Sequence, residues 1–148
     1  MRLLLQRVSR AEVRVEGRAV GAIGTGLVAL VGVGPDDTEA LAAGLADKTV
    51  HLRIFRDDAG LTNRSLLDVA GGLLAVSQFT LFGDTHRGRR PSFIGAAPPA
   101  LGAELYERFA AAVEARGVTV ARGIFGAEME IELVNDGPMT IWLDSAAG

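Results

Sequence analysis

The chain is organised around the run Leu27-Val28-Ala29-Leu30-Val31-Gly32-Val33, which is apolar throughout and rich in β-branched residues. A strand of this composition is buried on both faces, as in the middle of a sheet. Before it, residues 3–8 predict an apolar strand, and residues 13–15 alternate apolar and charged positions as a half-exposed strand does. After a turn at Glu16-Gly17, residues 20–23 can return as a hairpin partner.

A helix is predicted directly after the central run. Asp36 is a suitable N-cap, with Glu39 three residues later as its capping-box partner. Apolar residues and Thr49 then recur every three or four positions from Leu41 to Leu52, so we expect the helix to extend to about Phe55. Residues 57–60 predict a turn.

A third strand, a long loop and a second helix are predicted in the second half of the chain. Residues 73–82 predict a third buried strand, and residues 83–99 form a polar loop whose length is typical of functional loops. Pro98 and Pro99 begin a helix with one apolar face over residues 101–113, and Gly117 ends it.

The C-terminal part is predicted to be β-structure. Residues 118–121 form a short strand, and residues 128–134 and 139–143 form two strands joined by a turn at Asn135 to Pro138. No repeat or linker is visible, so residues 1–148 are predicted to form a single α/β domain with a mostly antiparallel sheet and two long helices.

Composition restricts the kinds of chemistry that the chain can perform. It has no cysteine, which excludes disulfides, thiolate zinc sites and cysteine nucleophiles, and with two histidines it offers little for a metal site. No apolar run approaches the ~18 residues of a membrane span, and arginines interrupt the N-terminal apolar residues, so we expect no signal peptide and a cytoplasmic location. With a net charge of −3, any contact with nucleic acid must be local.

Polar side chains interrupt the third strand near its end, at Ser77, Gln78 and Thr80. On a regular strand Gln78 and Thr80 share the face of Leu74 and Val76, whereas Ser77 lies on the other. These groups either bond to neighbouring backbone or line a pocket at the strand end. No histidine is near either hydroxyl in sequence, and a hydroxyl without a base is a poor nucleophile.

Three other features have competing interpretations. The turn at Asn135-Asp136-Gly137-Pro138 consists of ordinary hairpin residues, and its Gly-Pro bond is expected to be trans. The cluster Arg87, Arg89 and Arg90 is either a solvated loop or a phosphate contact. Gly32-Val33-Gly34 lacks the third glycine of a dinucleotide-binding turn, and two aspartates follow it, so we reject that site.

Taken together, two of these segments resemble the D-aminoacyl-tRNA deacylase family, whose members have a Ser-Gln-Phe-Thr-Leu strand and an Asn-x-Gly-Pro-x-Thr turn. Here they are Ser77-Gln78-Phe79-Thr80-Leu81 and Asn135 to Thr140. Other matching stretches, in the family's order, are Gln6-Arg7-Val8, Leu52-Arg53-Ile54-Phe55, Arg89-Arg90-Pro91-Ser92-Phe93 and Phe125-Gly126-Ala127-Glu128-Met129. The resemblance runs from Met1 to about Asp144. It departs at Gly60-Leu61-Thr62-Asn63, where many members have Gly-Lys-Met-Asn.

The resemblance implies a barrel-like fold that forms a homodimer with its pockets at the subunit interface. The partner is then aminoacylated tRNA, not DNA or a membrane, and no cofactor is needed. A Gly137–Pro138 turn with a cis peptide would present its carbonyls to the substrate's α-carbon and reject the L-configuration, while glycyl-tRNA would be accepted.

The resemblance also assigns roles to residues of the pocket. Ser77, Gln78, Phe79 and Thr80 would hold the ester and the terminal adenosine, largely through backbone groups. Phe125 and Met129 would form the adenine pocket, and Arg7 is assigned to substrate binding. Either the Thr80 hydroxyl attacks the ester, or the ribose 2′-hydroxyl assists an attack by water; the absence of a nearby base favours the second.

Overall fold

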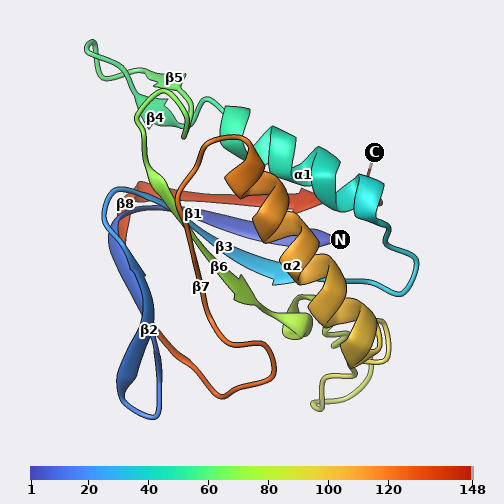
Figure 1. Cartoon of the computed structure of the whole chain (residues 1–148). Coiled ribbons are helices and arrows are strands. Elements are labelled where there is room, and N and C mark those ends of the chain that lie inside the picture. The colour runs from blue at the N-terminus through green and yellow to red at the C-terminus, as the bar shows by residue number, and fades with distance from the viewer. Residues whose placement is uncertain (148) are drawn as a thin grey trace.

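The computed structural model describes residues 1–147, which form one mixed sheet, two long helices and a small hairpin (Figure 1). The sheet has the strand order β2-β1-β3-β6-β7, with β8 pairing β1 off this path. Its strands are β1 (Arg2–Val15), β2 (Arg18–Ile23), β3 (Gly26–Gly32), β6 (Gly72–Ser77), β7 (Val120–Arg122) and β8 (Glu130–Asp144). The other elements are α1 (Glu39–His51), α2 (Pro99–Ala115), the hairpin β4 (Phe55–Arg56) and β5 (Thr62–Arg64), and a 3-10 helix, η1 (Phe79–Phe82).

The sheet curls until its two ends approach each other. Strand β1 pairs antiparallel with β2, β3 and β8, whereas β6 is parallel to both β3 and β7. Although β2 and β7 stand at opposite ends of the strand order, a side chain at Gly21 in β2 would lie 2.8 Å from the carbonyl oxygen of Arg122 in β7. This near closure confirms the predicted single-domain, barrel-like α/β architecture.

Strand β3 is buried on both faces, as its apolar run predicted. Leu27, Ala29 and Val31 belong to the core beneath the helices, whereas Val28 belongs to a second cluster inside the curled sheet. Helices α1 and α2 lie side by side over the first core (Figure 1). Two layers of apolar burial therefore hold β3 and its neighbour β6 in place.

Helix α2 follows its predicted pattern. Pro98 is the N-cap and Pro99 the first helical residue, while Gly117 adopts a φ of +93° directly after the C-cap Arg116. Of the predicted apolar face, Leu105, Phe109 and Val113 are buried and Leu101 is half-buried. Beside them the Tyr106 hydroxyl donates to the Ala75 carbonyl oxygen over 2.8 Å. Burial raises the pKa of Tyr106 to about 12. The helix is thereby joined to β6, the strand that leads into the candidate site.

The predicted boundaries of the first helix were wrong at both ends. The N-cap is Thr38, whose hydroxyl accepts from the Leu41 N–H over 3.2 Å, and not Asp36. The helix ends at His51 instead of Phe55, because Leu52 has an extended ψ of 128° and Phe55 already pairs with β5. The pairing of β4 with β5 therefore ends the helix earlier than its apolar periodicity predicted.

The predicted strand over residues 73–82 was also too long. Strand β6 ends at Ser77, and the Gln78 N–H donates to the Val31 carbonyl oxygen over 2.7 Å as the last bond to β3. The chain then enters η1, so Thr80 does not share a strand face with Leu74 and Val76 as predicted. The ladder stops here because β3 itself ends at Gly32.

The segment from Asn135 to Pro138 is a bulge, not the predicted hairpin turn. Strand β8 pairs with β1 on both sides of it, with Val8 opposite Asn135 and Gln6 opposite Thr140. The four residues between Asn135 and Thr140 therefore stand against the single residue Arg7 and must loop out. The chain does not reverse, so one long strand replaces the two predicted ones.

Candidate active site

Residues 78–82, which follow β6 and are called the turn, place polar backbone groups at an exposed position. Within η1 the Leu81 N–H donates to the Gln78 carbonyl oxygen over 3.2 Å, and the Gly83 N–H donates to that of Thr80 over 2.9 Å. The first N–H groups of a helix have no partner inside it, and here these belong to Phe79 and Thr80. Both residues are exposed, so their amides can serve an incoming acceptor.

Side-chain chemistry around Thr80 lacks a base. The Thr80 hydroxyl accepts a hydrogen bond from the side-chain amide of Gln78. His86 instead contacts Asp84, with 2.6 Å between Nδ1 and Oδ1, and Nδ1 of His51 lies 2.8 Å from the Asp47 carbonyl oxygen on α1. An amide nitrogen cannot remove a proton at neutral pH, so this hydroxyl is not activated by its neighbour.

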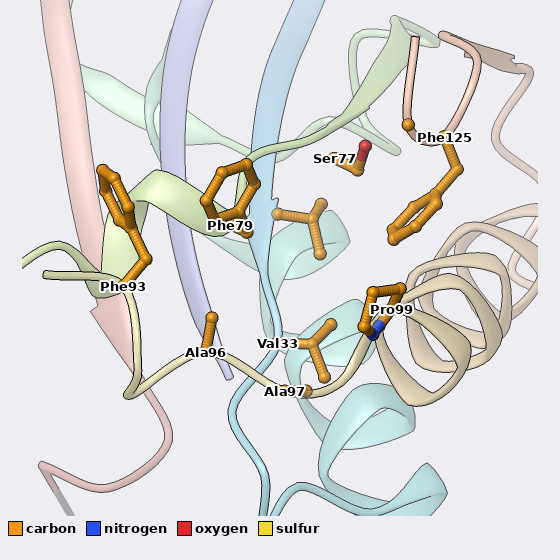
Figure 2. Close-up of a pocket in the computed structure, with 11 residues that line it drawn as sticks. Val33, Ser77, Phe79, Phe93, Ala96, Ala97, Pro99 and Phe125 are labelled. Carbon is orange, nitrogen blue, oxygen red and sulfur yellow. The ribbon is translucent and has the colours of Figure 1, made fainter.

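An apolar pocket of about 340 Å³ opens beside the turn (Figure 2). The Phe79 and Phe93 rings meet edge to face with centroids 5.1 Å apart, and Phe125 and Pro99 lie on the opposite side. Such a pocket suits a flat, largely apolar ring system. Its lining comprises Val31, Val33, Ser77, Phe79, Phe93, Ala96, Ala97, Pro99, Gly102, Phe125 and Gly126.

The β8 bulge is anchored from beneath by a buried arginine. Arg7 is 3% exposed; its Nε donates to the Asp136 carbonyl oxygen over 2.9 Å and its Nη1 donates to that of Ile54 over 2.6 Å. Burial, followed by the charge of Arg56, lowers the pKa of Arg7, and the Asp136 carboxylate opposes this. Arg56 also pairs with that carboxylate over 3.0 Å.

The bulge itself has a defined backbone path. The Asn135 side chain closes it, because its Oδ1 accepts from the Met139 N–H over 2.9 Å and its Nδ2 donates to the Thr140 hydroxyl over 3.0 Å. Gly137 has a φ of +138°, and the Gly137–Pro138 peptide is cis, as the resemblance implied and unlike the trans form that the sequence alone favoured. Both residues are exposed.

The turn and the bulge of one chain are held at different points of β1. Arg7 holds the bulge, whereas Nη1 of Arg2 donates to the Leu81 carbonyl oxygen of η1 over 2.9 Å. Arg2 and Arg7 are five positions apart, which on a strand is about 17 Å. The structure therefore anchors the two predicted halves of the site at separate positions on β1.

The remaining predicted residues separate into two groups. Phe125 lines the apolar pocket, but Met129 lies outside its lining and borders a second hollow with Arg14 and Glu128. Their assignment to an adenine pocket stays a prediction. Arg87, Arg89 and Arg90 are exposed in the loop before α2, where their contact with tRNA phosphates also stays a prediction.

Two contributors were missed by the sequence reasoning. Phe93 lies against Phe79, although only its membership of a matching stretch drew attention to it. Arg2 reaches η1 from the start of β1, and no motif or spacing pointed to it. Among residues 1–147 no three His, Asp or Glu side chains are grouped as metal ligands. Neither α1 nor α2 has the length and apolar character needed to cross a membrane.

Comparison with known proteins gives consistent matches along the whole chain. A family model described as D-Tyr-tRNA(Tyr) deacylase matches residues 4–144. The D-aminoacyl-tRNA deacylase of Roseiflexus castenholzii is 60% identical over 146 residues, 99% of this chain and 93% of that protein. The D-aminoacyl-tRNA deacylase of Deinococcus radiodurans is 56% identical over 144 residues, 97% of this chain and 99% of that protein.

Two solved structures share the fold. A structure described as c-Myc DNA Unwinding Element Binding Protein has a TM-score of 0.92 and 36% identity, covering 98% of this chain and 99% of that one. A probable eukaryotic D-amino acid tRNA deacylase has a TM-score of 0.83 and 22% identity, covering 96% of this chain and 97% of that one.

Proposed function

The chain belongs to the D-Tyr-tRNA(Tyr) deacylase family, and we propose that it hydrolyses the ester bond between a D-amino acid and the 3′ end of tRNA. Water is consumed, and the free D-amino acid and tRNA are released. The observation that carries this proposal is 56–60% identity, over nearly the whole chain, to proteins named D-aminoacyl-tRNA deacylase. The matched residues include both the turn after β6 and the β8 bulge.

Backbone groups of the turn supply the catalysis in this proposal. As water attacks the ester carbonyl, negative charge develops on the carbonyl oxygen, and the Phe79 and Thr80 N–H groups stabilise it. A single donor of this kind is typically worth about 10²–10³ in rate. The Thr80 hydroxyl accepts a hydrogen bond from the Gln78 side chain, and a carboxamide is not a base. The ribose 2′-hydroxyl of the substrate is therefore the better group to assist the water.

The apolar pocket holds the terminal adenosine. Phe79, Phe93 and Phe125 provide aromatic surfaces for a purine, and the half-buried Ser77 lies at the pocket edge nearest β6. Binding the adenine here positions the ester over the turn, since Phe79 belongs to both the pocket and η1. Stacking of a base on aromatic side chains is worth about 1–3 kcal/mol.

The bulge acts as the filter for chirality. The carbonyl oxygens of Gly137 and Pro138 face the α-carbon of the bound amino acid and exclude an L side chain, whereas glycine has none to exclude. Support comes from the exposure of both residues and from Arg7, which anchors the preceding Asp136 carbonyl in the protein interior. A filter must be rigid, and this anchor provides rigidity.

The complete site is formed by two chains of a homodimer in this proposal. The turn and the bulge are held by Arg2 and Arg7, which are five positions apart on β1, or about 17 Å along a strand. A twofold arrangement brings the bulge of one chain to the turn of the other. The exposed Val134 and Trp142 on β8 supply apolar surface for such an interface.

Hydrolysis of D-tyrosyl-tRNA compared with L-tyrosyl-tRNA tests the proposal. We expect the D-form and glycyl-tRNA to be cleaved and the L-form to survive. If neither tyrosyl substrate is cleaved, or both at the same rate, the proposal fails. Binding of uncharged and charged tRNA without turnover would support the alternative of a binding module on the same scaffold.

A further inference from the structure

The Arg2 side chain joins three segments that are far apart in sequence. Its Nη1 donates to the Leu81 carbonyl oxygen over 2.9 Å, and its Nε donates to Oδ2 of Asp144 over 3.2 Å. The guanidinium carbon lies 4.4 Å from the centre of the Phe82 ring and 5.8 Å from that of Trp142. The guanidinium group therefore donates hydrogen bonds from its edges and lies close to aromatic rings with its planar faces.

Two glycines make room for η1 at the end of β3. A Cβ atom at Gly32 would lie 3.1 Å from the Gln78 carbonyl oxygen and 3.2 Å from the Phe82 ring. A Cβ atom at Gly34 would lie 3.1 Å from the same ring. The Gly32-Val33-Gly34 sequence, unsuitable as a nucleotide-binding turn, thus allows close packing of η1.

We propose that Arg2, Gly32 and Gly34 form a clamp around Phe82 that positions η1, and that Arg2 is a positioning residue for hydrolysis. This inference rests on the proposed function, because what the clamp orients is the pair of amides of Phe79 and Thr80. A four-residue 3-10 helix has weak internal hydrogen bonds and lies beyond the end of the sheet ladder. Contacts from outside must therefore fix its orientation.

The Arg2 contacts require the shape of arginine and not only its charge. A lysine could pair with Asp144, but its compact ammonium cannot also donate to Leu81 at the opposite edge while lying flat on Phe82. Arg2→Lys therefore keeps the ion pair with Asp144 but loses the contacts with η1. Arg2→Ala loses the ion pair and the contacts. Arg10→Ala is a matched control: Arg10 is on the same strand, and its side chain pairs over 2.9 Å with Glu132, away from η1.

The test measures steady-state hydrolysis of D-tyrosyl-tRNA by these variants. We expect kcat to fall about 10–100-fold for Arg2→Ala and Arg2→Lys, as displacement of catalytic groups by about 1 Å does, with KM close to wild type. Arg10→Ala should match wild type. Titration with a D-tyrosyl-adenosine analogue, in which an amide replaces the ester, gives the fraction of binding-competent protein in each sample.

An independent readout comes from Trp142, the only tryptophan of the chain. Its emission should change in both Arg2 variants, because the cation beside its ring moves or disappears. Gly32→Ala, which adds a methyl group against η1 from the strand beside Arg2, should lower kcat in the same way. It replaces Arg2→Ala in the test if that variant does not fold.

The proposal is overturned if both Arg2 variants keep wild-type kcat, if Arg2→Lys restores full activity, or if loss of binding-competent protein accounts for the whole effect. A wild-type protein that cleaves no D-tyrosyl-tRNA would instead refute the proposed function. In that case the Trp142 emission of Gly32→Ala, which keeps Arg2, still reports whether a displacement of η1 moves the Arg2 guanidinium away from the Trp142 ring.

Discussion

The Thr80 hydroxyl accepts a hydrogen bond from Gln78, and this contact bears on the two proposed accounts of catalysis. A hydroxyl nucleophile needs a group that removes its proton, and a carboxamide cannot do so. The Thr80 N–H, at the start of η1, needs no activation to stabilise an oxyanion. At the scale of the residue, the backbone of Thr80 is better placed for the reaction than its side chain.

Replacement of Thr80 by alanine tests this directly. The backbone N–H survives, so we expect kcat for D-tyrosyl-tRNA to stay within about tenfold of wild type, whereas loss of a nucleophile costs far more, ~10³-fold or above. Ser77→Ala, which removes the other hydroxyl of the segment, is the companion variant and should behave similarly. Abolished turnover by Thr80→Ala with tRNA binding intact would assign the nucleophile to its side chain.

The bulge in β8 is an element whose backbone is determined by one glycine. At Gly137 a Cβ atom would lie 2.7 Å from Nη2 of Arg7 and 3.0 Å from the Met139 nitrogen, and the φ of +138° is unfavourable for any other residue. A methyl group here must therefore displace either the bulge or the arginine that anchors it.

Gly137→Ala should consequently weaken discrimination between D- and L-tyrosyl-tRNA. We expect the ratio of kcat/KM values to fall about tenfold, equivalent to about 1.4 kcal/mol, mainly through faster cleavage of the L-form. Gly17→Ala is the matched control, since Gly17 also has a positive φ of 77° but nothing within 4 Å of the added carbon. An unchanged D/L ratio in Gly137→Ala would count against the bulge as the filter.

Sequence patterns predicted the elements well where burial is regular. The central strand, both helices and the β2 hairpin partner follow from apolar periodicity and from proline and glycine signals. The predicted boundaries are wrong where hydrogen bonding to a distant segment determines the end of an element. Helix α1 ends early because Phe55 pairs with Arg64, and β6 ends early because its partner β3 ends at Gly32.

At the scale of the whole molecule, the separation of turn and bulge makes the association state a functional question. If the bulge of one chain serves the turn of its partner, defects in the two elements should complement each other in mixed dimers. If each chain is complete, mixing should change nothing.

Mixed dimers of two variants can distinguish these possibilities. Phe79→Pro removes an amide at the first position of η1, where proline fits, and should inactivate the turn while leaving the bulge intact. Gly137→Ala keeps an active turn beside a defective bulge. We expect Phe79→Pro chain, refolded with Gly137→Ala chain, to restore rejection of L-tyrosyl-tRNA; a different affinity tag on each chain isolates and verifies the heterodimers. Persistent cleavage of the L-form in verified heterodimers contradicts the two-chain site.

The sequence by itself determined the α/β class, the two helices, the buried central strand and the family, because these depend on local periodicity and on short motifs that stay contiguous. Only the tertiary structure decided that the Ser77–Leu81 motif is a strand end followed by a 3-10 helix, and that Asn135–Pro138 is a bulge anchored by Arg7. It also placed Arg2 within hydrogen-bond distance of the Leu81 carbonyl oxygen of η1. These features depend on hydrogen bonds between segments tens of residues apart, and no local pattern encodes such a partner.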